Sequence, residues 1–140
     1  MPFDLSGVNY WAAIVAGLAA FFVGGAWYQG IFGKLWVKLH GFSPERVKEM
    51  QAKMSPPKFF GGMIVSYVML GFALALLMSG LKEQSALTGA CTGFLVWVAS
   101  AAIAMTGHIA SDKVIGLYFI DVGCELAYLV LMGALLGAWR

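Results

Sequence analysis

The chain has 140 residues, of which 61% are hydrophobic and 11% are charged, with a formal net charge of +2. A soluble domain of this size is about 45–50% apolar and about 25% charged, so the composition excludes an ordinary water-soluble globular protein. The small positive charge is concentrated in one connection, which suits anionic lipid headgroups and excludes a nucleic-acid-binding surface.

Four long, nearly uncharged runs dominate the sequence. They cover residues 8–30, 59–80, 85–107 and 114–138. About 20 apolar residues in a helix cross a hydrocarbon core of ~30 Å, and only helices or closed barrels satisfy their backbone groups inside lipid. The runs are too uniformly apolar for barrel strands. The expected fold class is therefore an all-α, integral membrane four-transmembrane-helix bundle, formed by a single domain over residues 1–140.

The first run carries small residues along one side and aromatic residues at both ends. Ala13, Gly17, Ala20 and Gly24 supply the small residues, which allow another helix to approach closely. The pairs Tyr10/Trp11 and Trp27/Tyr28 mark the two ends. Tyrosine and tryptophan are enriched at membrane interfaces, so we expect these pairs to belong to an aromatic belt.

The connection over residues 31–58 predicts a short amphipathic helix. Ser43 is a good N-cap, Pro44 suits the first helical position, and Pro56 and Pro57 end the segment. The apolar face is formed by Val47, Met50 and Met54. We expect this helix to lie in the cytoplasmic interface, with Lys48, Lys53 and Lys58 contacting lipid headgroups. A plain solvated loop helix is the alternative.

The distribution of basic residues predicts the orientation. Of the nine lysines and arginines, seven lie in the connections on one side, namely Lys34, Lys38, Arg46, Lys48, Lys53, Lys58 and Lys113. The other side has Lys82 and Arg140. The positive-inside rule places the seven in the cytoplasm. In a bacterium this means a multi-pass protein of the inner membrane with both termini in the periplasm.

Two glycine ridges follow in the third and fourth runs. Gly89 and Gly93 are four residues apart, as are Gly133 and Gly137. This spacing lets two helices approach closely, either within one bundle or between subunits. We expect the chain to associate with itself or with another membrane protein, and one of the ridges is the candidate contact.

The fourth run contains two acids, Asp121 and Glu125, spaced to lie on one helical face near Tyr128. A charge at mid-membrane costs about 2.5–3.5 kcal/mol, so we expect both side chains to face the protein interior and at least one to carry a proton. One interpretation is a proton or cation relay that opens toward the cytoplasm beside His108 and Asp112. A second is structural, with hydrogen bonds to hydroxyls such as those of Ser66, Thr92 or Ser100. A third is contact with a partner's basic group or a cofactor.

Other chemistry finds little support in the sequence. There is no phosphate-binding loop, nucleophile elbow or zinc-protease motif, so we do not expect an enzyme. His40 and His108 fall short of a metal site, and the eight methionines suit gap-filling in the core. We expect no metal and no cofactor.

Several segments resemble a known bacterial family. These are "NYWAAIVAGLAAFFVGGAWYQGIFGKLW" near the start, "KMSPPKFFGG" after the connection and "YLVLMGALLGAWR" at the end. Over nearly the whole chain the sequence is similar to the family catalogued as domain of unknown function 1761. The resemblance implies a small four-helix integral membrane protein, and it implies no activity and no catalytic residues.

Two function classes follow from these observations. One is a homo-oligomeric, proton-linked channel or transporter for a small solute or ion. The other is an accessory subunit that packs laterally against a larger membrane complex. Because the chain leaves little outside the membrane, its function is expected to act within the bilayer or through lateral contacts.

Overall fold

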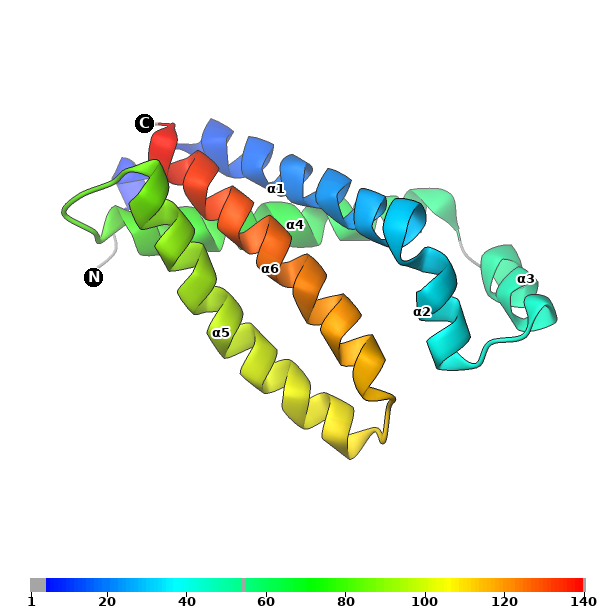
Figure 1. Ribbon diagram of the computed structural model, residues 1–140. Coiled ribbons are helices and arrows are strands. Elements are labelled where there is room, and N and C mark those ends of the chain that lie inside the picture. Colours follow the sequence, from blue (N-terminus) through cyan, green and yellow to red (C-terminus); the bar gives the residue numbers. More distant parts are fainter. Residues whose placement is uncertain (1–4, 54, 140) are drawn as a thin grey trace.

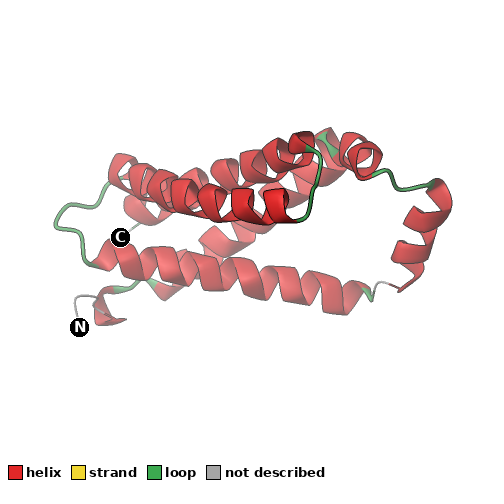
Figure 2. Cartoon of the chain, turned by 90° about the horizontal axis from the view of Figure 1, so that it is seen from below, coloured by secondary structure: helices red, strands yellow, loops and turns green. Residues whose placement is uncertain are grey.

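The structure is a computed structural model that describes residues 5–53 and 55–139, and in this part of the chain every element is helical (Figures 1 and 2). The four long helices are α1 (Tyr10–Gly25), α4 (Pro56–Ser79), α5 (Ala86–Ala110) and α6 (Ile115–Ala138). The short elements are the 3-10 turn η1 (Leu5–Gly7), the π-helical segment η2 (Ala26–Ile31), α2 (Gly33–His40) and α3 (Pro44–Lys53). Met54 and Arg140, which entered the sequence predictions, lie outside the described residues.

Each of the four predicted apolar runs coincides with one long helix. Helices long and apolar enough to cross a membrane cover Tyr10–Ile31, Pro57–Ser79, Ala86–Ala110 and Ile115–Ala138. The first of these includes η2, which continues α1 without a break. The all-α class and the number of long apolar helices are therefore confirmed.

Side-chain caps start three of the helices where the sequence favours them. The side chain of Asn9 accepts a hydrogen bond of 3.1 Å from the backbone N–H of Ala12 at the start of α1. Ser85 accepts from Thr88 in the same way at the start of α5. Ser43 accepts from Arg46 and begins α3, as predicted. Each cap satisfies a backbone donor that the helix itself leaves unpaired.

The connection after the first span holds a helix that the sequence analysis missed. α2 lies within the connection over residues 31–58 and carries Trp36. Gly41 ends α2 in the left-handed conformation, with φ of 72°, which favours glycine. α3 follows after a short turn, and Figure 1 shows both short helices beyond the same ends of α1 and α4.

The long helices pack as two antiparallel pairs, α1 with α4 and α5 with α6, and α1 also packs on α6. α4 and α5 are close at their shared connection, where a Cβ placed on Gly89 would lie 3.1 Å from Cε of Met78. Figure 1 shows that the two pairs diverge toward the opposite end. The two pairs are therefore farther apart at the end that carries α2 and α3.

Small residues bring the helices of each pair into backbone contact. In α1, Ala12, Ala16 and Ala20 are fully buried, and a Cβ on Gly17 would lie 2.7 Å from Cα of Val68 in α4. This is the small-residue face that the sequence predicts for the first run. Close backbone approach replaces bulky side chains as the packing element here.

The two glycine ridges pack against each other within one chain. A Cβ on Gly89 would overlap the carbonyl of Gly133, and one on Gly133 would overlap the carbonyl of Gly89. A Cβ on Gly93 would overlap the carbonyl of Leu129, and all four ridge glycines are buried. The expectation that one ridge joins two subunits is therefore wrong for this structure, because the α5–α6 contact occupies both ridges.

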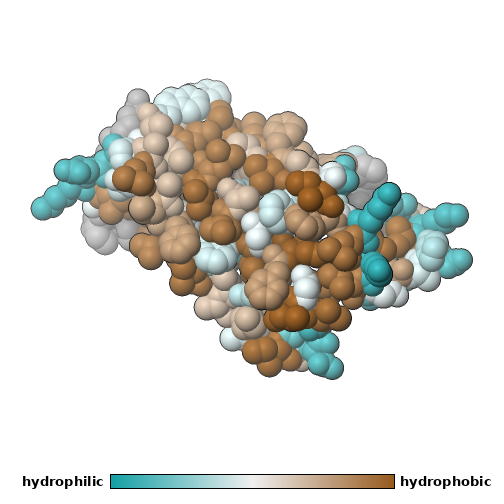
Figure 3. Space-filling model, in the orientation of Figure 1, coloured by the Kyte–Doolittle hydropathy of each residue, from teal (hydrophilic) through white to brown (hydrophobic). Residues whose placement is uncertain are grey.

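Large apolar side chains cover the outside of the long helices. Phe22, Leu87 and Ile103 are each more than 70% exposed. Figure 3 shows brown, apolar surface over the middle of the molecule and teal, polar surface at its ends, where Figure 1 places α3 and the turns that join the long helices. This is the reverse of the pattern on a water-soluble protein.

Candidate functional site

A large groove lies between the diverging helix pairs. Its volume is about 1300 Å³, and its lining residues come from α1, η2, α2, α3, α4 and α6. Phe21, Phe60 and Met63 supply apolar wall, and among the described lining residues the charged ones are Asp121 and Glu125 of α6. The groove therefore combines an apolar surface with the acids that the sequence analysis singled out.

Asp121 is held by a tyrosine from the far end of the first span. The hydroxyl of Tyr28 donates a hydrogen bond of 2.5 Å to Oδ1 of Asp121. Tyr28 lies in η2 and itself lines the groove. A phenol donating to a carboxylate is a strong, charge-assisted hydrogen bond when the acid is ionised.

Glu125 is held by a residue of the neighbouring helix α5. The hydroxyl of Ser100 in α5 donates a hydrogen bond of 2.8 Å to Oε2 of Glu125. Ser100 is one of the three hydroxyl partners that the structural interpretation suggested. The other two bond within their own helices, Ser66 to the carbonyl of Gly62 and Thr92 to that of Thr88.

Neither Asp121 nor Glu125 has a positively charged partner among the described residues. The ion pairs in this part of the chain are those of Glu49 with Arg46 and with Lys53. Each acid also uses one oxygen for its hydrogen bond, and the second oxygen receives no donor from the part of the chain that the structure describes. Both side chains are half-buried and line the groove. Each acid thus has an acceptor atom free for a molecule in the groove.

The π-helical segment η2 places two neighbouring aromatic residues on α6. Besides the bond from Tyr28, the indole N–H of Trp27 donates a hydrogen bond of 2.9 Å to the backbone carbonyl of Ile120. A glycine is required at position 33, two residues after this segment, because a Cβ on Gly33 would overlap the carbonyl of Tyr28. Short π-helical turns inside α-helices often occur at functional sites.

Trp27 and Tyr28 were predicted to belong to a general aromatic belt, and this interpretation missed their specific contacts. Each of the two bonds joins residues 93 positions apart. No local feature of the sequence indicates such a pairing. The packing of η2 against α6 decides it.

A pair of tyrosines forms the wall next to Glu125. The rings of Tyr67 in α4 and Tyr128 in α6 meet edge to face, with centroids 5.2 Å apart. Gly24 makes room for this pair, because a Cβ there would lie 2.9 Å from the hydroxyl oxygen of Tyr67. Tyr128 was expected near the acids and does line the groove with them.

His108, the fourth residue of the predicted polar site, lies elsewhere. Its ring contacts that of Tyr118, with centroids 5.3 Å apart, and its buried Nε2 has no hydrogen-bond partner among the described residues. The hydroxyl of Tyr118 donates to the carbonyl of Ala101 in α5. Neither His108 nor Asp112 lines the groove, so a relay from these residues to the acids finds no support in the structure.

The three lysines expected to contact lipid headgroups lie in α3 and at the start of α4. Lys48 and Lys58 are exposed, and Lys53 contacts Glu49 at 3.4 Å within α3. Met50, on the apolar face of α3, lines the groove. Contact of these lysines with lipid headgroups stays a prediction.

His40 closes the end of α2 in an aromatic cluster. Its ring lies 4.1 Å from that of Trp36 and 4.8 Å from that of Phe42, between centroids. Burial, and then the positive charge of Lys113, lower the pKa of His40 below its usual value of 6.5. The neutral form of this histidine is therefore the one that the fold favours.

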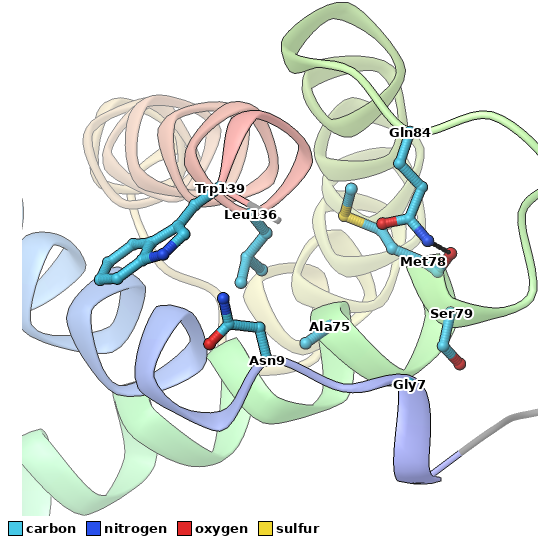
Figure 4. Close-up of a pocket in the computed structure, with 8 residues that line it drawn as sticks. All are labelled: Gly7, Asn9, Ala75, Met78, Ser79, Gln84, Leu136 and Trp139. Carbon is cyan, nitrogen blue, oxygen red and sulfur yellow. Dashed lines mark hydrogen bonds between the residues drawn. The ribbon is translucent and has the colours of Figure 1, made fainter.

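A second, much smaller pocket of about 120 Å³ lies at the opposite end of the molecule (Figure 4). Asn9, Ser79, Gln84 and Trp139 are its polar lining residues, and the side-chain amide of Gln84 donates a hydrogen bond of 2.9 Å to the carbonyl of Met78. Its size suits a few water molecules. Among the described residues, no three His, Cys, Asp or Glu side chains gather as a metal site requires.

Comparison with known proteins identifies one family. A family model described as "Protein of unknown function (DUF1761)" matches residues 11–137. The resemblance seen in the sequence is thereby confirmed. No curated protein and no solved structure matches the chain.

Proposed function

The chain belongs to the family of proteins of unknown function DUF1761, and we propose its function from the groove itself. The protein is a non-enzymatic membrane protein that transports a small solute or ion, with Asp121 and Glu125 exchanging protons for that solute. The observation that carries the proposal is a groove of about 1300 Å³ whose two charged lining residues are carboxylates without positively charged partners.

Membrane insertion is supported by the distribution of polarity. Four helices are long and apolar enough to cross a bilayer, and large apolar side chains point outward from them. In water this surface would have to be covered, whereas lipid tails solvate it directly. The proposed orientation has both termini in the periplasm, so that the groove and α3 lie toward the cytoplasm.

Proton linkage is supported by the setting of the acids. Among the described residues that line the groove, the others with a titratable group are Tyr28, Tyr67, Cys124 and Tyr128, and none of them carries a positive charge. A carboxylate without a counter-ion in such surroundings is neutralised either by a proton or by a bound cation. Exchange of one for the other is the elementary step of proton-linked transport.

The proposal is tested in liposomes under an imposed pH gradient. Lumen pH is followed with a dye, first alone and then with small cationic, anionic and neutral solutes added outside. We expect the protein to speed the loss of the gradient with at least one solute, and the Asp121→Asn/Glu125→Gln variant to behave like empty liposomes. The exposed acid Glu83 supplies the control, because Glu83→Gln leaves the groove intact.

Wild-type protein that never differs from empty liposomes overturns the transport proposal. The accessory-subunit alternative then gains support if a second polypeptide co-purifies in mild detergent. The open side between α4 and α5 is the surface that such a subunit would cover.

A further inference from the structure

We propose that the groove binds a lipophilic organic cation, which is a single positive charge carried by a bulky aromatic or alkyl body. This inference rests on the proposed function, because it names the class of solute that the same site takes. It is argued from the charge, the walls and the size of the groove.

The charges of the groove select a cation. Its two charged lining residues are Asp121 and Glu125, and none of its described lining residues is Lys, Arg or His. Each acid keeps one oxygen without a hydrogen-bond donor among the described residues. An anion would be repelled by both acids, and a neutral molecule would leave their charge uncompensated, whereas a cation supplies the missing partner.

The walls of the groove select an organic cation over a metal ion. The rings of Phe21 and Phe60 meet edge to face at 6.0 Å, and those of Tyr67 and Tyr128 meet at 5.2 Å. Aromatic faces attract weakly hydrated cations, and the apolar walls favour a ligand whose surface is itself mostly apolar. A hard metal ion requires a shell of about six or more oxygen ligands. Asp121 and Glu125, each already bonded to a different hydroxyl, do not provide such a shell.

The groove has more than enough room for this class of ligand. Its volume of about 1300 Å³ lies above the range of roughly 300–1,000 Å³ that is usual for sites of drug-sized molecules. A proton or an inorganic ion alone would leave almost all of this space to water or lipid. A bulky cation fills the apolar part while its charge lies near the acids.

Two probes of the same size and shape and of opposite charge test the inference. Binding of tetraphenylphosphonium and of tetraphenylborate is measured by equilibrium dialysis on the protein in nanodiscs, with empty nanodiscs subtracted. We expect saturable binding of the phosphonium only. Asp121→Asn/Glu125→Gln should weaken it by about tenfold or more, since it removes both charge partners, and Glu83→Gln should leave it unchanged.

Equal binding of the two probes, or unchanged phosphonium binding in the double variant, overturns the inference. Circular dichroism checks that the double variant is folded. If it is not, Glu125→Gln alone and the comparison of the two probes on wild-type protein decide the question.

The result is separable from that of the transport assay. Phosphonium binding without solute-driven proton movement would refute the proposed transport and keep the cation site. Proton movement with another solute, and no phosphonium binding, would refute the cation site and keep the transport.

Discussion

The hydroxyl of Tyr28 lies 2.5 Å from Oδ1 of Asp121, although 93 residues separate the two along the chain. This hydrogen bond joins the end of the first span to the last helix. It also fixes the direction of one of the two acids in the groove. The π-helical segment that carries Tyr28 is therefore part of the candidate site.

Removing this hydroxyl should destabilise the contact between η2 and α6. Tyr28→Phe keeps the ring and deletes the donor to Asp121, and we expect a loss of about 1.5–3 kcal/mol in the free energy of unfolding, the usual contribution of a hydrogen bond to a charged group. Thermal unfolding in detergent measures the effect. Tyr10→Phe is the matched control, because its hydroxyl donates to an exposed carbonyl, that of Leu5. Equal stability of the two variants would show that the bond to Asp121 contributes nothing.

The glycine ridge should tolerate no methyl group. Gly89→Ala places a Cβ on the carbonyl of Gly133, and overpacking of this kind costs about 1–3 kcal/mol. Gly107→Ala on the same helix is the control, because nothing lies within 4 Å of its Cβ, and alanine there should be neutral or stabilising. The oligomeric state should be the same for both variants. A Gly89→Ala protein of normal stability that changes its oligomeric state would instead place the ridge between subunits.

His40 should make stability depend on pH. Burial and the positive charge of Lys113 lower the pKa of His40 in the folded protein, and this effect is larger than the opposite effect of Asp121. The unfolded chain therefore binds a proton at His40 more readily than the folded chain does. Stability should therefore fall as the pH drops below about 6.5 and level off below the pKa of the folded state. His40→Gln, which does not titrate, should reduce this slope in thermal unfolding between about pH 5 and 8. An unchanged slope would remove His40 as its origin.

The orientation should follow the basic residues. In a background with the exposed Cys91 replaced by alanine, we expect a cysteine at Gln51 to be labelled only from the cytoplasm and one at Glu83 only from the periplasm. Glu83 is chosen over the neighbouring Ser85, whose side chain caps α5. An impermeant maleimide on intact cells, before and after permeabilisation, distinguishes the two sides. Labelling of the Gln51 position in intact cells would reverse the orientation.

Much of the fold could be predicted from the sequence because it depends on local properties. The four long helices follow from runs of apolar residues, and the start of α3 follows from Ser43 and Pro44. The stacking of Asp121 and Glu125 on one face follows from their four-residue spacing. α2 was missed because no capping side chain marks its start, since Phe32 at the N-cap position makes no side-chain hydrogen bond to the helix.

The partners of those residues were decided only by the tertiary structure. Nothing local tells whether Gly133 faces Gly89 of its own chain or another subunit, and nothing local joins Tyr28 to Asp121 or Ser100 to Glu125. The groove exists because the pair α1–α4 diverges from the pair α5–α6, while α1 and α6 remain in contact. Hydropathy and helical spacing act over a few residues, so local sequence specifies which helices form and that two acids share a face. What those acids face depends on how helices far apart in the chain pack together. That packing rests on backbone contacts between distant segments, which no local sequence pattern indicates.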